Sequence, residues 1–156
     1  MAKWLSLSGI AAGSVGVFLG FYFYFGGASD TALAVVTVMT VGVVGLLAFV
    51  RHVFFFRSDM ERLGWQTDRP DWIFEVGFAN LALAFAALLA VFARWGVEAQ
   101  AVVVIAYALY LFQAAGLHAY RYVTSIEKSP ARLWRSVVAT ALLAAMMMFF
   151  AIAALV

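Results

Sequence analysis

The chain has 156 residues, of which 67% are hydrophobic and only 12% are charged, and its formal net charge is +2. A soluble domain of this size buries only about two-thirds of its surface, so it has no room to hide that much apolar area from water. The apolar content also excludes a disordered chain, and without a basic stripe on a soluble face nucleic-acid binding has no support. The lack of cysteine excludes disulfides, thiolate metal sites and thiol nucleophiles. The composition therefore predicts an integral membrane protein.

Five apolar stretches are each long enough to cross a bilayer, which takes about 20 mostly apolar residues in a helix. We therefore predict an all-α fold: a single transmembrane domain over residues 1–156, built as a bundle of five transmembrane helices. The expected spans are residues 4–25, 31–56, 72–92, 98–120 and 133–156.

Glycines recur along the first span with three residues between them, as Gly9 and Gly13 and then Gly16 and Gly20. Small residues at this spacing let helix backbones approach closely. The pattern favours either packing within the bundle or contact with a second copy or a partner membrane protein.

Helix-capping residues stand at several span boundaries. Ser29 and Asp30 are expected to cap the second span and Asp71 the third, while Ser129 followed by Pro130 opens the fifth. Tryptophan favours the headgroup level of a bilayer, and all five tryptophans fall near span edges or in the loop at residues 57–71: Trp4, Trp65, Trp72, Trp95 and Trp134.

The longest connection, residues 57–71, follows the second span. Within it, Ser58 and Glu61 have the spacing of a capping box. The segment is therefore expected to be either a short helix lying in the membrane interface or a solvated loop.

Positive charges divide unequally between the two sides of the predicted bundle. Arg94 is the one Lys or Arg on the far side, and the rule that positive loops stay inside then places the N-terminus in the cytoplasm and the C-terminus outside the inner membrane. The first apolar run is too long for a typical signal peptide, so it is expected to be an anchor. The positive residues on the cytoplasmic side are Lys3, Arg51, Arg57, Arg62, Arg69, Arg121, Lys128, Arg132 and Arg135.

Three ionisable side chains reach a similar depth near the expected cytoplasmic edge. His52 ends the second span, Glu75 lies early in the third and His118 lies late in the fourth. Ionisable groups within spans are costly and usually functional. We therefore expect a polar cavity open to the cytoplasm that binds or passes a small ligand, with Glu75 as its central charge.

Further polar residues extend this candidate site. Arg51 precedes His52, and the amides of Asn80 and Gln113 are expected to pair between the third and fourth spans. Tyr107 and Tyr110 lie on the same broad face of the fourth span as Gln113, which predicts either a tyrosine-lined pocket or hydroxyls satisfied across the bundle.

Two other functions remain open. His52, His118 and Glu75 form a legitimate ligand set for zinc, iron or copper, and the two histidines alone are a legitimate axial pair for haem. Such a chain would be a membrane enzyme or redox protein. In the other function, the chain is an accessory or structural subunit of a membrane complex, and its glycine faces make the contacts with the partner. A purely structural alternative for the ionisable residues is that Glu75 pairs with Arg51 or Arg121, while the histidines hydrogen-bond at the interface.

Two segments of the chain resemble a sequence pattern found in other proteins. Arg62-Leu63-Gly64-Trp65, followed by the run from Phe74 to Leu81, resembles a pattern in small bacterial membrane proteins of uncharacterised function. The resemblance covers roughly residues 52–130 and implies no activity, but it marks Glu75 and Asn80 for testing. In the pattern a glycine directly precedes a histidine, whereas here Leu117 separates Gly116 from His118.

Overall fold

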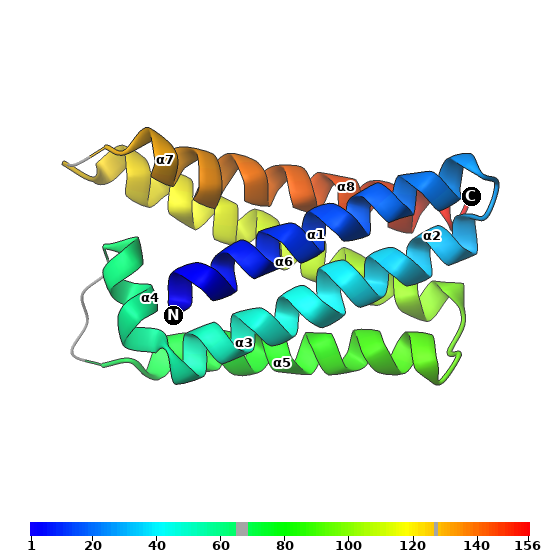
Figure 1. The fold of residues 1–156 in the computed structure, drawn as a ribbon, viewed down its shortest axis with the longest axis horizontal. Helices are drawn as coiled ribbons and strands as arrows, with labels where there is room; N and C mark the ends of the chain where they lie inside the picture. Colours follow the sequence, from blue (N-terminus) through cyan, green and yellow to red (C-terminus); the bar gives the residue numbers. More distant parts are fainter. Residues whose placement is uncertain (65–68, 127) are drawn as a thin grey trace.

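The computed structural model describes residues 1–64, 69–126 and 128–156. It confirms the all-α fold: the described residues form helices and turns and include no strand. Five helices are long and apolar enough to cross a membrane. Figure 1 shows them side by side as an elongated bundle, with the two termini toward opposite ends.

The second and fifth long helices are each built from consecutive segments that differ in hydrogen-bonding pattern. In the second, a π-helical segment, η1, joins two α-helical ones, and in the fifth, α7 and a π-helical segment, η2, precede α8. In η1 the hydroxyls of Thr37 and Thr40, both fully buried, donate 2.7 Å hydrogen bonds to the carbonyls of Leu33 and Val36. The elements are α1 (Ala2–Phe25), α2 (Ser29–Val36), η1 (Thr37–Val43), α3 (Val44–Phe54), α4 (Phe56–Leu63), α5 (Asp71–Phe92), α6 (Val97–Thr124), α7 (Pro130–Leu133), η2 (Trp134–Val138) and α8 (Ala139–Ala153).

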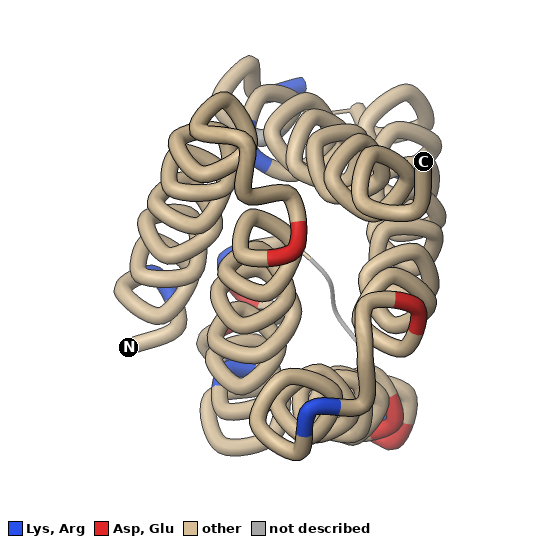
Figure 2. The backbone as a smooth tube through the Cα atoms, turned by 90° about the vertical axis from the view of Figure 1, so that its right-hand side faces the viewer, with Lys and Arg blue, Asp and Glu red and all other residues tan. Residues whose placement is uncertain are grey.

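The helices are arranged around a core that lies toward the α2 end of the bundle. The most extensive pairings are α3 with α5 and α6 with α8. Figure 2 looks along the bundle from the end opposite α4, and the long helices are uncharged over most of their length. Large apolar side chains are exposed on their outer faces, for example Phe18, Phe85 and Phe92. A bilayer fits this distribution because it solvates apolar side chains.

Several glycines lie where neighbouring helices approach each other closely. On α1, a Cβ built on Gly16 would lie 2.5 Å from the Cβ of Met39, and one on Gly20 would lie 2.7 Å from Val36. On α5, a Cβ on Gly77 would lie 2.6 Å from Val53. At Gly16 and Gly20, α1 therefore packs closely within the bundle, against η1 and α2.

Gly16→Ala is expected to lower the free energy of unfolding by about 1 kcal/mol or more, because the new methyl group overpacks the contact with Met39. Gly9→Ala is the matched control on the same helix, since a Cβ there meets nothing within 4 Å. Thermal unfolding of both variants in detergent measures the difference. Equal melting temperatures would contradict the packing described.

Several boundary predictions need correction. α2 begins at Ser29 and α5 at Asp71, with Ala28 and Pro70 as their N-cap residues. Asp30 and Asp71 therefore lie inside the first helical turn and make no capping hydrogen bond. There the carboxylates instead face the positive end of the helix dipole. Ser129 is the N-cap residue before Pro130, as expected, but its side chain makes no capping hydrogen bond either.

Residues 57–71 are partly helical. The second long helix breaks at Phe55, and α4 then begins at Phe56, two residues before the predicted cap at Ser58. α4 ends at Leu63, and the C-cap residue Gly64 has a φ of 69°, the left-handed conformation that favours glycine. Of the two alternatives for this segment, a short helix is confirmed, and it buries Asp59, Met60 and Leu63. Trp65 lies outside the described residues.

Candidate functional site

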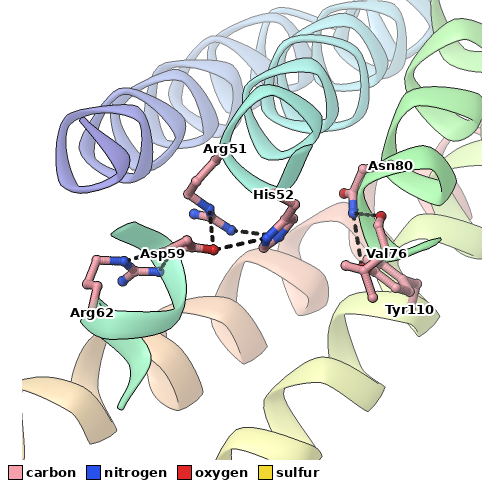
Figure 3. A network of polar contacts seen from close by, with 7 residues as sticks. All are labelled: Arg51, His52, Asp59, Arg62, Val76, Asn80 and Tyr110. Carbon is pink, nitrogen blue, oxygen red and sulfur yellow. Dashed lines mark hydrogen bonds and ion pairs between the residues drawn. The ribbon is translucent and has the colours of Figure 1, made fainter. Parts of the chain in front are cut away.

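A buried carboxylate lies at the centre of a charged cluster where α4 folds back onto the end of α3. The side chain of Asp59 has no exposed surface. Its Oδ2 lies 2.9 Å from Nδ1 of His52 and 3.3 Å from Nε of Arg51, both at ion-pair distance without the alignment of a hydrogen bond. Its Oδ1 accepts hydrogen bonds of 2.8 and 3.1 Å from Arg62, one turn along α4. Figure 3 shows the three basic side chains converging on Asp59.

The local fold explains this convergence. The break at Phe55 turns the chain, so that α4 brings Asp59 back toward the last turn of α3. Burial raises the pKa of the Asp59 carboxyl, but the contact with the His52 ring and the charges of Arg51 and Arg62 outweigh it and hold the pKa at about 2. Asp59 is therefore charged at neutral pH and anchors α4 to α3.

The contacts of His52 define its tautomer. Nη2 of Arg51 lies 3.1 Å from Nε2 of His52. A guanidinium has only donors, so Nε2 accepts and the proton of the neutral ring is on Nδ1, which faces Asp59. Both ring nitrogens are engaged, so neither is left to ligate a metal in this arrangement.

A second polar cluster joins α5 to α6 deeper in the bundle. Asn80 is 2% exposed, and its Oδ1 accepts a 2.8 Å hydrogen bond from the hydroxyl of Tyr107. Its Nδ2 donates to the hydroxyl of Tyr110 at 3.0 Å and to the carbonyl of Val76 at 2.8 Å. The expected partner of Asn80 was Gln113. The structure gives it two tyrosines instead, which satisfies their hydroxyls across the bundle, as one of the two alternatives for this face predicted.

Both clusters border one groove of about 890 Å³ in the half of the bundle near α4. At the α2 end a packed core, which includes Leu33, Val104 and Met147, fills the bundle. The polar residues that line the groove are Ser6, Ser14, Arg51, His52, Arg62, Asn80, Tyr107, Tyr110, Gln113, His118, Arg135, Ser136 and Thr140.

Five of the six candidate residues border this groove. They come from three spans: Arg51 and His52 from α3, Asn80 from α5, and Gln113 and His118 from α6. Glu75 does not join them, because its side chain is exposed on the outer face of α5 and it is not among the groove-lining residues. The groove thus contains most of the expected site without its expected central charge.

The metal-site hypothesis depended on His52, His118 and Glu75 meeting. Over the described parts of the chain, no three His, Asp or Glu side chains come together in a way that could hold a metal ion. Arg51 pairs with Asp59, not with Glu75 as the structural alternative expected.

Sequence reasoning missed two residues of this site. Asp59 lies between the two residues of the predicted capping box and is assigned no role there, and Arg135 is counted only as a positive charge on the cytoplasmic side. The signal for Asp59 was available: it lies three residues before Arg62, the spacing at which helical side chains of opposite charge meet. Its contact with α3 depends on the break at Phe55, which the apolar run of residues 53–56 gives no sign of.

Comparisons with known proteins assign the chain to a family. No curated protein and no solved structure matches it significantly. The model of one protein family, described as a family of unknown function, matches residues 3–155. This agrees with the expected resemblance to proteins of uncharacterised function. Because the match covers almost the whole chain, the chain belongs to the DUF6790 family.

Proposed function

We propose that this chain is a membrane protein that binds a small ligand in the groove beside α4. The observation that carries the proposal is the groove itself, whose volume of about 890 Å³ lies within the range of roughly 300–1,000 Å³ typical of ligand pockets. A mostly apolar lining with a few convergent polar groups is also typical of such pockets. Here the polar groups come from α1, α3, α4, α5, α6, η2 and α8.

Binding is better supported than passage. The groove occupies the half of the bundle near α4, whereas the other half contains the buried core of Leu33, Val36, Val104, Met147 and Phe150. A ligand that enters from the α4 end therefore meets close-packed side chains before it reaches the far side. Passage would require these helices to separate.

We further propose that the α4 end faces the cytoplasm of a cell with this protein in its inner membrane, because the positive residues gather there. The chain has no cysteine, so single cysteines report orientation without background. Ala93→Cys and Ala131→Cys are a matched pair, both exposed and at opposite ends of the bundle. A membrane-impermeant maleimide is expected to label Ala93→Cys in intact cells and Ala131→Cys only after lysis. The reverse pattern would overturn this orientation.

Gly9→Leu is expected to remove most of the ligand that copurifies with the protein. Gly9 lines the groove on the face of α1 that also carries Gly13 and Gly16, and a side chain there would enter open space. Ala11→Leu is the control, because Ala11 is exposed on α1 and lies outside the groove. Mass spectrometry of small molecules released from equal amounts of each purified protein measures the difference.

The outcome is decisive in both directions. Release of a molecule in stoichiometric amounts from the unmodified protein and from Ala11→Leu, but not from Gly9→Leu, supports binding in the groove. Equal release from all three proteins, with each one folded, would contradict it.

A further inference from the structure

We infer that the ligand is an amphiphile with an anionic head group and an apolar chain, drawn from the bilayer; this inference rests on the ligand-binding function proposed above. Two features of the groove carry it. One is an excess of positive charge at the α4 end. The other is an apolar passage that reaches the outer surface of the bundle between α1 and α8.

The charge excess comes from three arginines. Arg51, Arg62 and Arg135 line the groove, and none of the described lining residues carries a carboxylate. Asp59, which is fully buried, is engaged by Arg51 and Arg62. Three arginines against one aspartate leave two positive charges, since His52 is neutral in the arrangement described above. Arg51 and Arg62 are partly buried, and partly buried positive charge in a membrane protein calls for an anionic partner.

Arg135 is the arginine best placed to meet a ligand. It lines the groove from η2, whereas the Asp59 cluster belongs to α3 and α4, and its side chain is exposed. Its Nε donates a 3.3 Å hydrogen bond to the carbonyl of Ala131, and within the described residues no carboxylate pairs with it. The rest of a guanidinium fork suits a phosphate or carboxylate oxygen pair, which it binds through two parallel hydrogen bonds.

The apolar passage follows from how α1 and α8 diverge. Side chains of α8 approach α1 closely at two positions: a Cβ on Gly20 would lie 2.9 Å from Phe150, and a Cβ on Gly13 would lie 3.4 Å from Leu143. One turn nearer the α4 end, a Cβ built on Gly9 would have no neighbouring atom within 4 Å. Figure 1 shows the same divergence, with α1 leaving α8 toward the N-terminus.

Apolar side chains line this passage and continue onto the surface. Ile10 and Leu142 border the groove and are nonetheless 41% and 54% exposed. In a spanning bundle such a surface faces acyl chains, so the groove is continuous with the bilayer interior. An apolar chain can lie between α1 and α8 while its head group meets the arginines, and a wholly polar anion would leave that passage unfilled.

The test compares three molecules with the same twelve-carbon chain length: dodecyl phosphate, laurate and the neutral monolauroylglycerol. Native mass spectrometry of the full-length protein measures the affinity of each, and inorganic phosphate is added as a chain-free competitor. We expect both anionic amphiphiles to bind more tightly than the neutral one. We expect inorganic phosphate to compete only weakly, because it lacks the chain.

Arg135→Gln is expected to weaken binding of dodecyl phosphate about tenfold or more, because a hydrogen bond to a charged group contributes about 1.5–3 kcal/mol. Monolauroylglycerol should change little, and Arg135→Lys should restore part of the phosphate affinity. Arg57→Gln is the matched control. Arg57 is an exposed arginine of α4 that stacks on Phe56 and does not line the groove.

The outcomes separate this inference from the function on which it rests. Equal affinity for the charged and neutral amphiphiles, lost in Gly9→Leu, would keep the groove as a binding site and overturn the anionic head group. Inorganic phosphate that binds as tightly as dodecyl phosphate would overturn the amphiphile. No binding of any of the three, with the protein folded, would count against the proposed function as well.

Discussion

Asp59→Asn is expected to lower the free energy of unfolding by about 3 kcal/mol or more. The substitution keeps the shape of the side chain but removes the negative charge that contacts Arg51, His52 and Arg62. Removing one member of a buried charge cluster is costly because its partners stay desolvated without compensation. The loss should appear first as detachment of α4 from α3.

Glu61→Gln is the matched control for this prediction, since Glu61 is an exposed acid of the same helix. Its replacement should change the stability by less than about 0.5 kcal/mol. Unfolding in mixed micelles gives the free energies, and hydrogen exchange of the α4 amides reports whether the helix detaches. Similar stabilities for Asp59→Asn and Glu61→Gln would contradict the anchoring role of Asp59.

The pH dependence gives an independent check on the same residue. The pKa of Asp59 is lowered from 3.8 to about 2 in the folded protein. A lowered pKa means that the stabilisation is fully present above pH 3.8 and is lost as the pH falls through about 2. The unmodified protein should therefore lose about 2 kcal/mol over this interval that Asp59→Asn does not lose. Parallel stability curves for the two proteins would contradict the assignment.

Asn80→Leu is expected to lower the free energy of unfolding by about 1–3 kcal/mol. The change leaves the hydroxyl of Tyr107, a residue that is 1% exposed, without the acceptor it has at 2.8 Å. An unsatisfied buried polar group costs more than a hydrogen bond contributes. The triple variant Asn80→Leu, Tyr107→Phe, Tyr110→Phe removes all three polar groups and should recover most of the loss.

Gln113→Leu is the control for the Asn80 cluster. Gln113 is exposed at the groove, and its amide is not among the partners of Asn80. Its replacement should leave the stability nearly unchanged in the same thermal unfolding experiment. A large loss of stability for Gln113→Leu, or a triple variant less stable than Asn80→Leu alone, would contradict the hydrogen bonds of Asn80 described above.

The fold could be predicted from the sequence because the bilayer sets the length and polarity of each span. Helices of 20–28 residues in the structure fall close to the five expected apolar runs. Lipid is as apolar as the interior of the bundle, however, so the apolar pattern carries little information about which face of a span points inward. This is why the spans could be predicted without their rotations.

The prediction for Glu75 was wrong because the rotation of α5 was unknown. It lies five residues before Asn80, about 140° around a helix of 3.6 residues per turn, so the two side chains cannot share one face. Asn80 points inward and Glu75 is exposed. Helical geometry alone therefore argued against a site containing both.

Asp59 was missed for a different reason. It lies outside the apolar spans, so a search for polar groups within them passed over it, and only the break at Phe55 brings it to Arg51 and His52. Arg135 likewise joins the groove only because η2 lies beside α6. Contacts between elements distant in sequence decide both positions.

The central claim is that the groove binds an anionic amphiphile. A crystal structure of the protein, from crystals grown in a lipidic phase that contains dodecyl phosphate, would test it most directly. The account predicts head-group density within hydrogen-bonding distance of Arg135 and chain density between α1 and α8, alongside Ile10 and Leu143. The groove should remain open in the same crystals grown with monolauroylglycerol, without density at the arginines. The account would be contradicted if α1 packed against α8 as far as Gly9 and closed the groove. It would also be contradicted if the head-group density lay away from the arginines.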